Sequence, residues 1–345
     1  MDFIRGVGGL GLVFLLFLLG LVLHPDRLWK IFRQASLVTL CSATTFFLAG
    51  FGLTVAVVAL APMAYDLTPV QMIFIGFTTA FSSTLLVVKL LPTRRLHESA
   101  VGTQAIGILI VEDVLAIAVL LGMAAMAQTE TAADVGWRLP LGLAMLAAAF
   151  PAERYGLRPL MRRIETFPEL LFILSLAWCL ALAEGAGALG FSREIGAFVA
   201  GLALARNPLS LYIWEKVAPL RDFFVVLLFF SLGALVDIRW QMMPAVLLAA
   251  FLALVLVLLK PYVFRLILRA FRTDRTLAEE AGWRLGQCSE FGLIIAFLAR
   301  QQNLIGHQAF EIILMATLFS FLVSTYIVVL KYPSPLGVSP AMHQA

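Results

Sequence analysis

Two adjacent acidic residues, Glu112 and Asp113, lie in the middle of a long apolar stretch over residues 101–127. About 20 mostly apolar residues suffice for a membrane-spanning helix, so this stretch would place both carboxyl groups near mid-depth. An ionisable side chain at the bilayer centre costs about 2.5–3.5 kcal/mol on insertion scales. At least one of the two acids must therefore be paired or protonated. The pattern predicts a functional buried carboxylate site, with a buried charge that only holds helices together as the alternative.

A counter-charge for this pair is available far along the chain. Lys260 lies within the apolar stretch 243–270 and is followed by Pro261, which removes a backbone hydrogen-bond donor from the helix. A lysine near a helix end can instead extend its ammonium group to the membrane surface. Apolar residues on both sides of Lys260 favour an intramembrane position. One cation and two anions would then form an internal ion pair and leave one carboxylate free.

Two other apolar stretches carry polar and small residues at mid-span. Residues 69–91 contain Thr78, Thr79, Ser82, Ser83 and Thr84, and residues 279–300 contain Gly286, Gln287, Ser289, Glu290 and Gly292. Such residues can serve helix packing alone. Their positions correspond in the two halves of the chain, which favours two discontinuous helices of an inverted repeat. The unwound backbone and half-helix ends would then form an ion site at the midplane.

The composition indicates a membrane protein. Hydrophobic residues make up 61% of the 345 and charged residues only 13%, with a mean hydropathy of +0.97, whereas soluble domains carry roughly 25% charged residues. The net charge of +4 comes from scattered short basic clusters, which argues for contact with the membrane surface and against nucleic-acid binding. Cys41, Cys179 and Cys288 lack the spacing of a disulfide framework or a zinc site, and no cofactor is expected.

Eleven apolar stretches are candidate membrane helices. They cover residues 8–23, 36–61, 69–91, 101–127, 138–151, 168–189, 193–208, 221–238, 243–270, 279–300 and 306–330. The longest polar stretch between them, 152–167, is predicted to be a loop. The sequence therefore predicts an all-α membrane protein of about eleven transmembrane helices.

Basic residues alternate between the connecting loops. Loops after odd-numbered stretches, with the residues at their edges, hold fifteen Lys and Arg residues. Loops after even-numbered stretches hold only Arg138, Arg193, Arg239 and Arg300. By the positive-inside rule, the odd-numbered loops are cytoplasmic. The N-terminus is then outside and the C-terminus cytoplasmic, and the regular alternation supports the count of eleven.

Seven segments of the chain are similar to one family in the family's own order. They are LFLLGLVLHPDRLWK (16–30), FSSTLLVVKLL (81–91), IVEDVLAI (110–117), EIGAFVAGLALA (194–205), LFFSLGALVDI (228–238), Lys260 and LGQCSEFGLI (285–294). Each segment alone is weakly specific. Together they cover nearly the whole chain, which resembles the membrane domain of the monovalent cation:proton antiporter-2 family, and the potassium-efflux antiporters in particular.

The resemblance implies a sodium/proton-antiporter-like fold within a single transmembrane exchanger domain, residues 1–332. A core domain with two crossed, broken helices would comprise about residues 36–127 and 243–330. A scaffold that forms a homodimer would comprise about residues 8–23 and 138–238. The resemblance also implies an inner (plasma) membrane location.

The family's motifs assign roles to individual residues of this chain. Asp113 looks like the carboxylate that binds cation and proton, and Glu112 takes the preceding position, which varies between branches. Lys260 matches a lysine that can pair with that neighbour. The helix breaks and the cavity lining then fall on Ser82, Ser83, Thr84, Gln287, Ser289 and Glu290.

The chain departs from the family pattern at its ends. Two acids of the family's motif are replaced here by Val22 and His24, and the chain resembles the family only from its third helix onward, so two scaffold helices are not matched. The tail 333–345 contains three prolines and is predicted to be a short disordered cytoplasmic segment. We expect no nucleotide-binding regulatory domain within this chain.

The hypothesis that follows is monovalent cation (K⁺ or Na⁺)/proton antiport, with cation and proton competing for Asp113 by alternating access. Three alternatives remain open at this point: a sodium-coupled organic-anion symporter of similar fold, a cation channel, and an inactive fragment. A membrane enzyme is disfavoured because the sequence has no GxSxG, HExxH or paired GxGD/YD motif. The partner of Arg284 also stays open among Glu279, Glu280 and Glu290.

Overall fold

A computed structural model describes residues 25–90, 100–127, 147–189, 193–234 and 242–332, with residues 144, 145 and 191 and short helical stretches between 10 and 21. Every regular element in these residues is a helix. The chain divides into two compact units. The first comprises Met1–Leu28 and Leu121–Asp237, and the second comprises Trp29–Leu120 and Ile238–Ala345.

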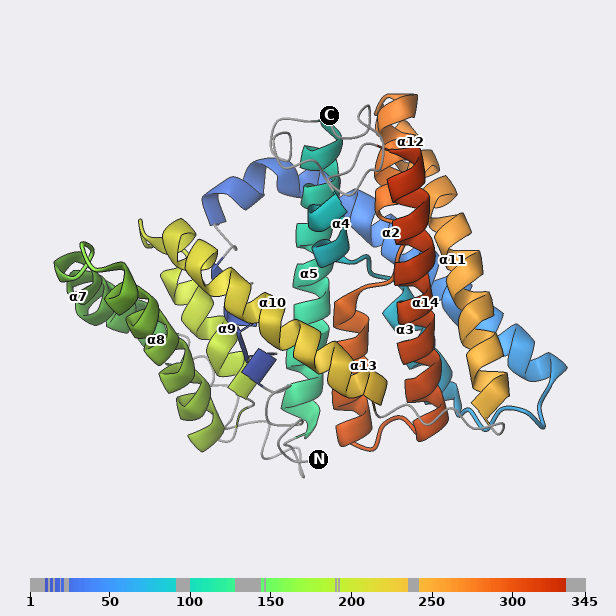
Figure 1. The fold of residues 1–345 in the computed structure, drawn as a ribbon, viewed down its shortest axis with the longest axis horizontal. Coiled ribbons are helices and arrows are strands. Elements are labelled where there is room, and N and C mark those ends of the chain that lie inside the picture. The colour runs from blue at the N-terminus through green and yellow to red at the C-terminus, as the bar shows by residue number, and fades with distance from the viewer. Residues whose placement is uncertain are drawn as a thin grey trace. The chain divides into compact units, whose positions relative to one another are not determined.

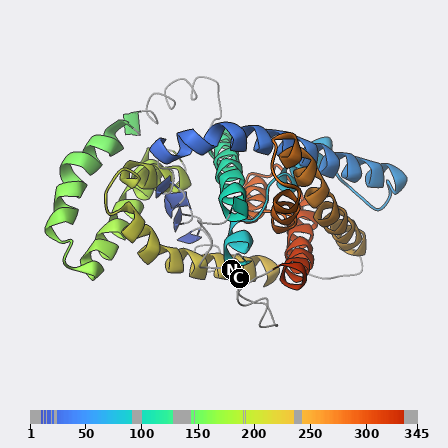
Figure 2. The same cartoon turned by 90° about the horizontal axis from the view of Figure 1, so that it is seen from above.

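The second unit holds all the residues that the sequence marks as candidate site residues. Its helices are α2 (Pro25–Leu60), α3 (Pro69–Thr79), α4 (Thr84–Leu90), α5 (Ala100–Ala127), α11 (Met243–Ala270), α12 (Arg275–Arg284), α13 (Glu290–Gln301) and α14 (His307–Lys331). Helix α11 packs along α14 and α12, and α13 packs against both α14 and α3. Figures 1 and 2 show α11 and α14 side by side from two directions.

The ends of the short helices in this unit follow from their sequences. Helix α3 begins after Thr68, whose hydroxyl and the side chain of Gln71 form a reciprocal capping box. Helix α13 begins after Ser289, whose hydroxyl accepts from the backbone N–H of Phe291 at 3.0 Å. Such side-chain caps satisfy backbone groups that have no partner within a helix. Ser289 is buried, so α13 starts inside the unit, whereas Thr68 is exposed and α3 starts at its surface.

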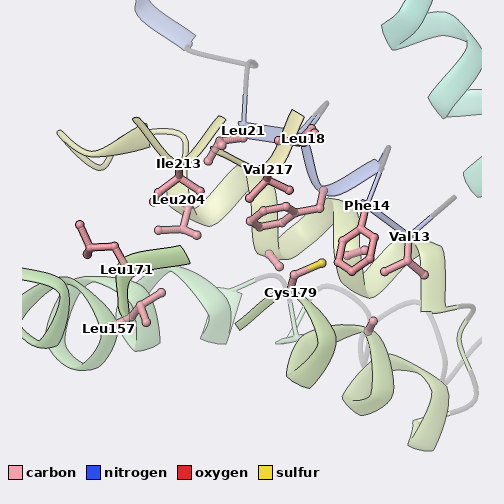
Figure 3. Packing of buried hydrophobic residues seen from close by; sticks show 14 of the residues in the cluster. Val13, Phe14, Leu18, Leu21, Leu157, Leu171, Cys179, Leu204, Ile213 and Val217 are labelled. Carbon is pink, nitrogen blue, oxygen red and sulfur yellow. The ribbon is translucent and has the colours of Figure 1, made fainter. Parts of the chain in front are cut away.

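The first unit is built from short and long helices around an apolar cluster. Its described elements are the π-helix η1 (Ala152–Leu157) and the α-helices α7 (Arg158–Arg163), α8 (Pro168–Ala188), α9 (Arg193–Leu204) and α10 (Ser210–Ala234). The cluster brings Val13 and Phe14 from the N-terminal stretch together with Cys179 of α8 and Val217 of α10, as Figure 3 shows. Cys179 is fully buried there as a free thiol.

The prediction of a loop over residues 152–167 is wrong, because residues 152–163 are helical. The polar residues of this segment pair with one another. The buried carboxylate of Glu153 accepts from Nε and Nη2 of Arg158, each at 3.1 Å, and from Nδ2 of Asn207 at 2.7 Å. A hydropathy profile predicts such residues to be solvent-exposed, because it takes no account of hydrogen-bond partners from other parts of the chain.

Two helices begin well before the apolar stretches that predict them. Helix α2 begins at Pro25 and not near residue 36, and α10 begins at Ser210 and not near residue 221. The added turns of α10 include Glu215 and Lys216, both exposed, so charged residues extend a helix beyond its apolar part. Among the described residues, four helical segments are long and apolar enough to cross a bilayer: Ala35–Leu60, Pro168–Ala188, Met243–Ala270 and His307–Lys331.

The count of eleven membrane helices stays a prediction. The tail 333–345, Val22, His24 and half of the stretch 138–151 lie outside the described residues.

Candidate ion-binding site

The two predicted helix breaks are present, and they lie against each other. The first separates α3 from α4 at residues 80–83, and the second separates α12 from α13 at residues 285–289. The hydroxyl of Ser82 donates to the backbone carbonyl of Leu285 at 3.0 Å, and the side-chain amide Nε2 of Gln287 donates to the backbone carbonyl of Ser83 at 3.3 Å. Two unwound segments from distant parts of the chain therefore satisfy each other's backbone groups.

The helix after the second break crosses α3 at close range. A Cβ atom placed on Gly292 of α13 would lie 3.0 Å from the carbonyl oxygen of Thr78 and 3.1 Å from its Cβ. Helix backbones can approach this closely only where a small residue stands at the contact. Gly292 thus sets the spacing at which α3 and α13 cross.

Replacing Gly292 with alanine is expected to push the two helices apart. Overpacking of this kind costs about 1–3 kcal/mol, which outweighs the gain of about 1 kcal/mol in helix propensity over glycine. We expect a lower thermal unfolding temperature in detergent. Gly52→Ala in α2 is the matched control, because nothing lies within 4 Å of a Cβ added there. Equal unfolding temperatures for the two variants would contradict the assigned role of Gly292.

Lys260 joins the two breaks from α11. Its ammonium nitrogen is fully buried and donates to the carbonyl of Phe81 at 2.8 Å and to the carbonyl of Gln287 at 2.9 Å. The nitrogen also lies 5.2 Å from the centre of the Phe46 ring, within the range of a cation–π contact. Lys260 is therefore buried inside the unit, where its side chain is held between the two breaks.

Glu112 meets the first break through the backbone. Its Oε2 accepts from the N–H of Ser82 at 2.7 Å, while its Oε1 is buried without a hydrogen-bond partner. The hydrogen bonds of Lys260 go to the two carbonyls and not to Glu112. The positive charge of Lys260 nevertheless acts on Glu112 across space. The sequence-based pairing of these residues therefore stays a prediction.

Asp113 meets the same break through a side chain. The hydroxyl of Thr84, the first residue of α4, lies 3.1 Å from both carboxylate oxygens of Asp113. Adjacent residues on a helix point about 100° apart, and here the two acids contact different groups of one break. Asp113 is 6% exposed and Glu112 1%, so both sit in an environment from which water is largely excluded.

The remaining predicted residues also lie at the breaks. Ser83 accepts from the N–H of Leu86 at 3.2 Å through its hydroxyl, and Ser289 caps α13, whose first residue is the buried Glu290. All nine candidate residues, from Ser82 to Glu290, thus belong to the second unit and surround its two breaks.

Two residues of α14 support the second break and were not singled out from the sequence. Ser320 accepts from the N–H of Cys288 at 3.0 Å, and Ser324 donates to Oε1 of Gln287 at 2.9 Å. Two buried serines four residues apart share one helix face. That spacing in an otherwise apolar helix is the signal by which they could have been found.

Arg284 pairs with Glu280, one of the three acids that the sequence left open. Its Nη2 lies 2.7 Å from Oε1 of Glu280, and its Nη1 donates to the carbonyl of Leu90 at the end of α4. The buried guanidinium therefore links α12 to the last residue of α4.

The arrangement offers a carboxylate with a neighbouring hydroxyl and unwound backbone beside it. Oxygen atoms of these kinds are the ligands that hard cations prefer, and the same carboxylate can take a proton.

The family described as "Sodium/hydrogen exchanger, transmembrane" matches residues 1–330. The chain belongs to this family.

Individual members of the exchanger family are similar along almost the whole chain. A putative K(+) efflux antiporter KefB of Alkalimonas amylolytica is 28% identical over 95% of this chain and 49% of its own length. K(+) efflux antiporter 6 of Arabidopsis thaliana is 26% identical over 96% of this chain and 55% of its own length. This chain thus spans about half the length of these curated relatives.

The fold of the chain is also similar to a solved structure. The sodium proton antiporter MjNhaP1 from Methanocaldococcus jannaschii matches 96% of this chain and 86% of its own, with a TM-score of 0.56 and 16% identity. Identity this low supports the fold alone. The predicted family resemblance and the predicted sodium/proton-antiporter-like all-α fold are both confirmed.

Proposed function

We propose that this chain exchanges a monovalent cation, K⁺ or Na⁺, for protons by alternating access. The observation that carries the proposal is the position of Asp113. It is a nearly buried carboxylate that faces the hydroxyl of Thr84 where α4 begins, beside two unwound segments. Membership of the exchanger family and the names of the K(+) efflux antiporter relatives support cation/proton exchange.

The proposed mechanism is competition for one carboxylate. Ionised Asp113 binds the cation, and the Thr84 hydroxyl with oxygens of residues 80–83 completes the shell. Protonation of Asp113 removes the negative charge and the cation leaves. The site carries either a cation or a proton each time it switches from facing one side of the membrane to facing the other. The two species therefore move in opposite directions.

We also propose the domain organisation and the membrane orientation in which this mechanism operates. Residues 36–127 and 243–330 would form the moving core, and residues 8–23 and 138–238 the scaffold through which two copies associate. The N-terminus would lie outside and the C-terminus in the cytoplasm of the inner membrane, as the distribution of basic residues predicts.

The test is dissipation of a pH gradient in proteoliposomes on addition of K⁺ or Na⁺. Proton movement that requires one of these cations and occurs in the opposite direction supports the proposal. Cation flux without proton movement would indicate a channel. Proton-independent uptake of an organic anion with Na⁺ would indicate a symporter, and a folded protein without any flux would indicate an inactive fragment. Each of these three results would overturn antiport.

A further inference from the structure

Four arginines of the first unit form no ion pair with a carboxylate of the described residues. Arg154, Arg162 and Arg163 are exposed on the continuous helix of η1 and α7, and Arg206 is exposed in the turn between α9 and α10. By contrast, the exposed Arg193 at the start of α9 is paired with Glu184 at 3.0 Å. The four residues, which we call the arginine cluster, therefore have positive charge available for an anionic group from outside the unit.

A printed sequence spacing and one backbone contact bring the cluster together from two elements. Arg158 is four residues from both Arg154 and Arg162, and residues at that spacing share one face of a helix. Nη2 of Arg158 donates to the backbone carbonyl of Arg206 at 3.5 Å. The turn that carries Arg206 is therefore held against the basic face of the helix.

The acid of this helix is turned away from the cluster. Glu153 is 2% exposed and accepts from Arg158 and Asn207. Residues five apart on an α-helix point about 140° apart, but the wider π turn of η1, in which the N–H of Arg158 donates to the carbonyl of Glu153, brings both side chains to one side. Glu153 is thus neutralised inside the unit. The exposed acids Glu165 and Glu169 lie beyond the end of α7, so the face of the cluster keeps its positive charge.

The cluster lies beside the ends of two helices that pack along each other, α8 and α9 (Figure 1). Helix α8 is long and apolar enough to cross a bilayer. Glu153 binds Asn207 shortly after α9 ends, and Met161 shares an apolar cluster with Leu171 in the first turn of α8. The basic helix is therefore level with one end of a candidate membrane helix, where phospholipid headgroups would surround it.

Exposed apolar side chains accompany the arginines. Tyr155 is 74% exposed, with the guanidinium of Arg154 5.6 Å from its ring centre, and Leu160 is 45% exposed. Tyrosine is enriched at membrane–water interfaces, where its amphipathic ring lies at the level of the headgroups. A helix with arginines and exposed apolar residues next to a buried face is typical of an element that lies at a membrane surface.

We propose that the arginine cluster binds the phosphate headgroup of an anionic phospholipid, with Tyr155 and Leu160 against the upper part of its acyl chains. The planar guanidinium of arginine matches a phosphate through two parallel N–H donors, and basic clusters at the cytoplasmic ends of membrane helices bind anionic lipids. The proposed orientation places this end of the unit at the inner leaflet. The inference rests on that orientation and does not require the proposed exchange.

The test is native mass spectrometry of the full chain in detergent, with dioleoylphosphatidylglycerol and dioleoylphosphatidylcholine added in turn. The two lipids have the same acyl chains, but only phosphatidylglycerol carries a net negative charge. We expect the wild type to bind phosphatidylglycerol at least about tenfold more tightly than phosphatidylcholine. Equal dissociation constants for the two lipids would overturn the proposal.

A triple variant, Arg154→Gln with Arg162→Gln and Arg163→Gln, locates the site. It keeps Arg158, and with it the partner of the buried Glu153. Each arginine near an anionic headgroup contributes about fivefold to affinity, so the three changes together should weaken phosphatidylglycerol binding by about a hundredfold. Binding of phosphatidylcholine should stay as in the wild type. Unchanged phosphatidylglycerol binding in this variant would contradict the proposed site.

Arg193→Gln is the matched control, because it removes an exposed arginine of the same unit at the opposite end of α9. Its preference for phosphatidylglycerol should equal that of the wild type, and a loss as large as in the triple variant would overturn the site. If the triple variant does not elute as a folded species in size-exclusion chromatography, Arg154→Gln and Arg162→Gln decide singly. Each should weaken binding about fivefold, and no weakening in either would count against the proposal.

Inorganic phosphate separates a lipid site from a site for a soluble anion. Added in about hundredfold molar excess over phosphatidylglycerol, it should leave the lipid bound, because burial of the acyl chains adds affinity that a free anion lacks. Displacement of the lipid by inorganic phosphate would indicate a soluble-anion site and would overturn lipid binding.

Discussion

Asp113→Asn is expected to reduce cation-dependent proton movement to the level of protein-free vesicles. Asparagine has nearly the same size and can still accept from Thr84, but it cannot bear a negative charge. It can therefore neither hold a monovalent cation by its charge nor carry a proton across. The measurement is pH-gradient dissipation on adding K⁺ or Na⁺, with wild type and variant at equal protein density.

The loss of exchange in Asp113→Asn should not come from unfolding. Removing a charge from a nearly buried site eliminates its desolvation cost, so the thermal unfolding temperature should stay the same or rise. Asp66→Asn is the matched control. Its side chain is exposed, and its contact with Gln308 is made by the backbone N–H. Wild-type exchange in Asp113→Asn would rule out this carboxylate as the shared binding site.

Lys260→Met is expected to produce the largest loss of stability. The change removes both hydrogen bonds that join the carbonyls of Phe81 and Gln287. It also removes a buried positive charge from a unit that holds buried carboxyl groups, Glu112 and Asp113 among them. Deleting one partner of a buried charge arrangement costs about 3–5 kcal/mol, so we expect a much lower unfolding temperature in detergent and loss of exchange.

Lys331→Met provides the control for charge removal at a surface. Lys331 lies 3.1 Å from Glu279 with 43% of its side chain exposed, and exposed ion pairs contribute about 0–1 kcal/mol. Its unfolding temperature should stay close to that of the wild type. A similar drop in the two variants would show that Lys260 has no special place between the breaks.

Particular residues show why part of the site could be predicted from sequence. Glu112, Asp113 and Lys260 interrupt apolar stretches. Burying a charge there costs free energy, so each of these residues indicates a functional site. The hydroxyl and glycine residues of 78–84 and 286–292 weaken a helix locally and supply caps. Both effects depend on residue type and on neighbours in the sequence, so the two breaks and their polar residues can be predicted from the sequence alone.

The partners of these residues could not be predicted in the same way. Lys260 donates to Phe81 across 179 positions of the sequence, and Arg284 donates to Leu90 across 194. Several acids were equally plausible for Arg284, and the loop expected at 152–167 became helical because Glu153 finds Asn207. Such choices depend on which segments pack together.

The sequence by itself therefore determined the family, the all-α membrane class, the two breaks, and Glu112, Asp113 and Lys260 as buried charged residues. Only the tertiary structure decided that Lys260 binds the carbonyls of both breaks, that Glu112 accepts from the backbone of Ser82, and that Asp113 faces Thr84. The physical reason is the difference in the sequence separation over which the two effects are determined. The cost of burying a charge is fixed by the residue and its apolar surroundings, whereas its compensation requires an atom within about 3 Å, and folding alone brings that atom near.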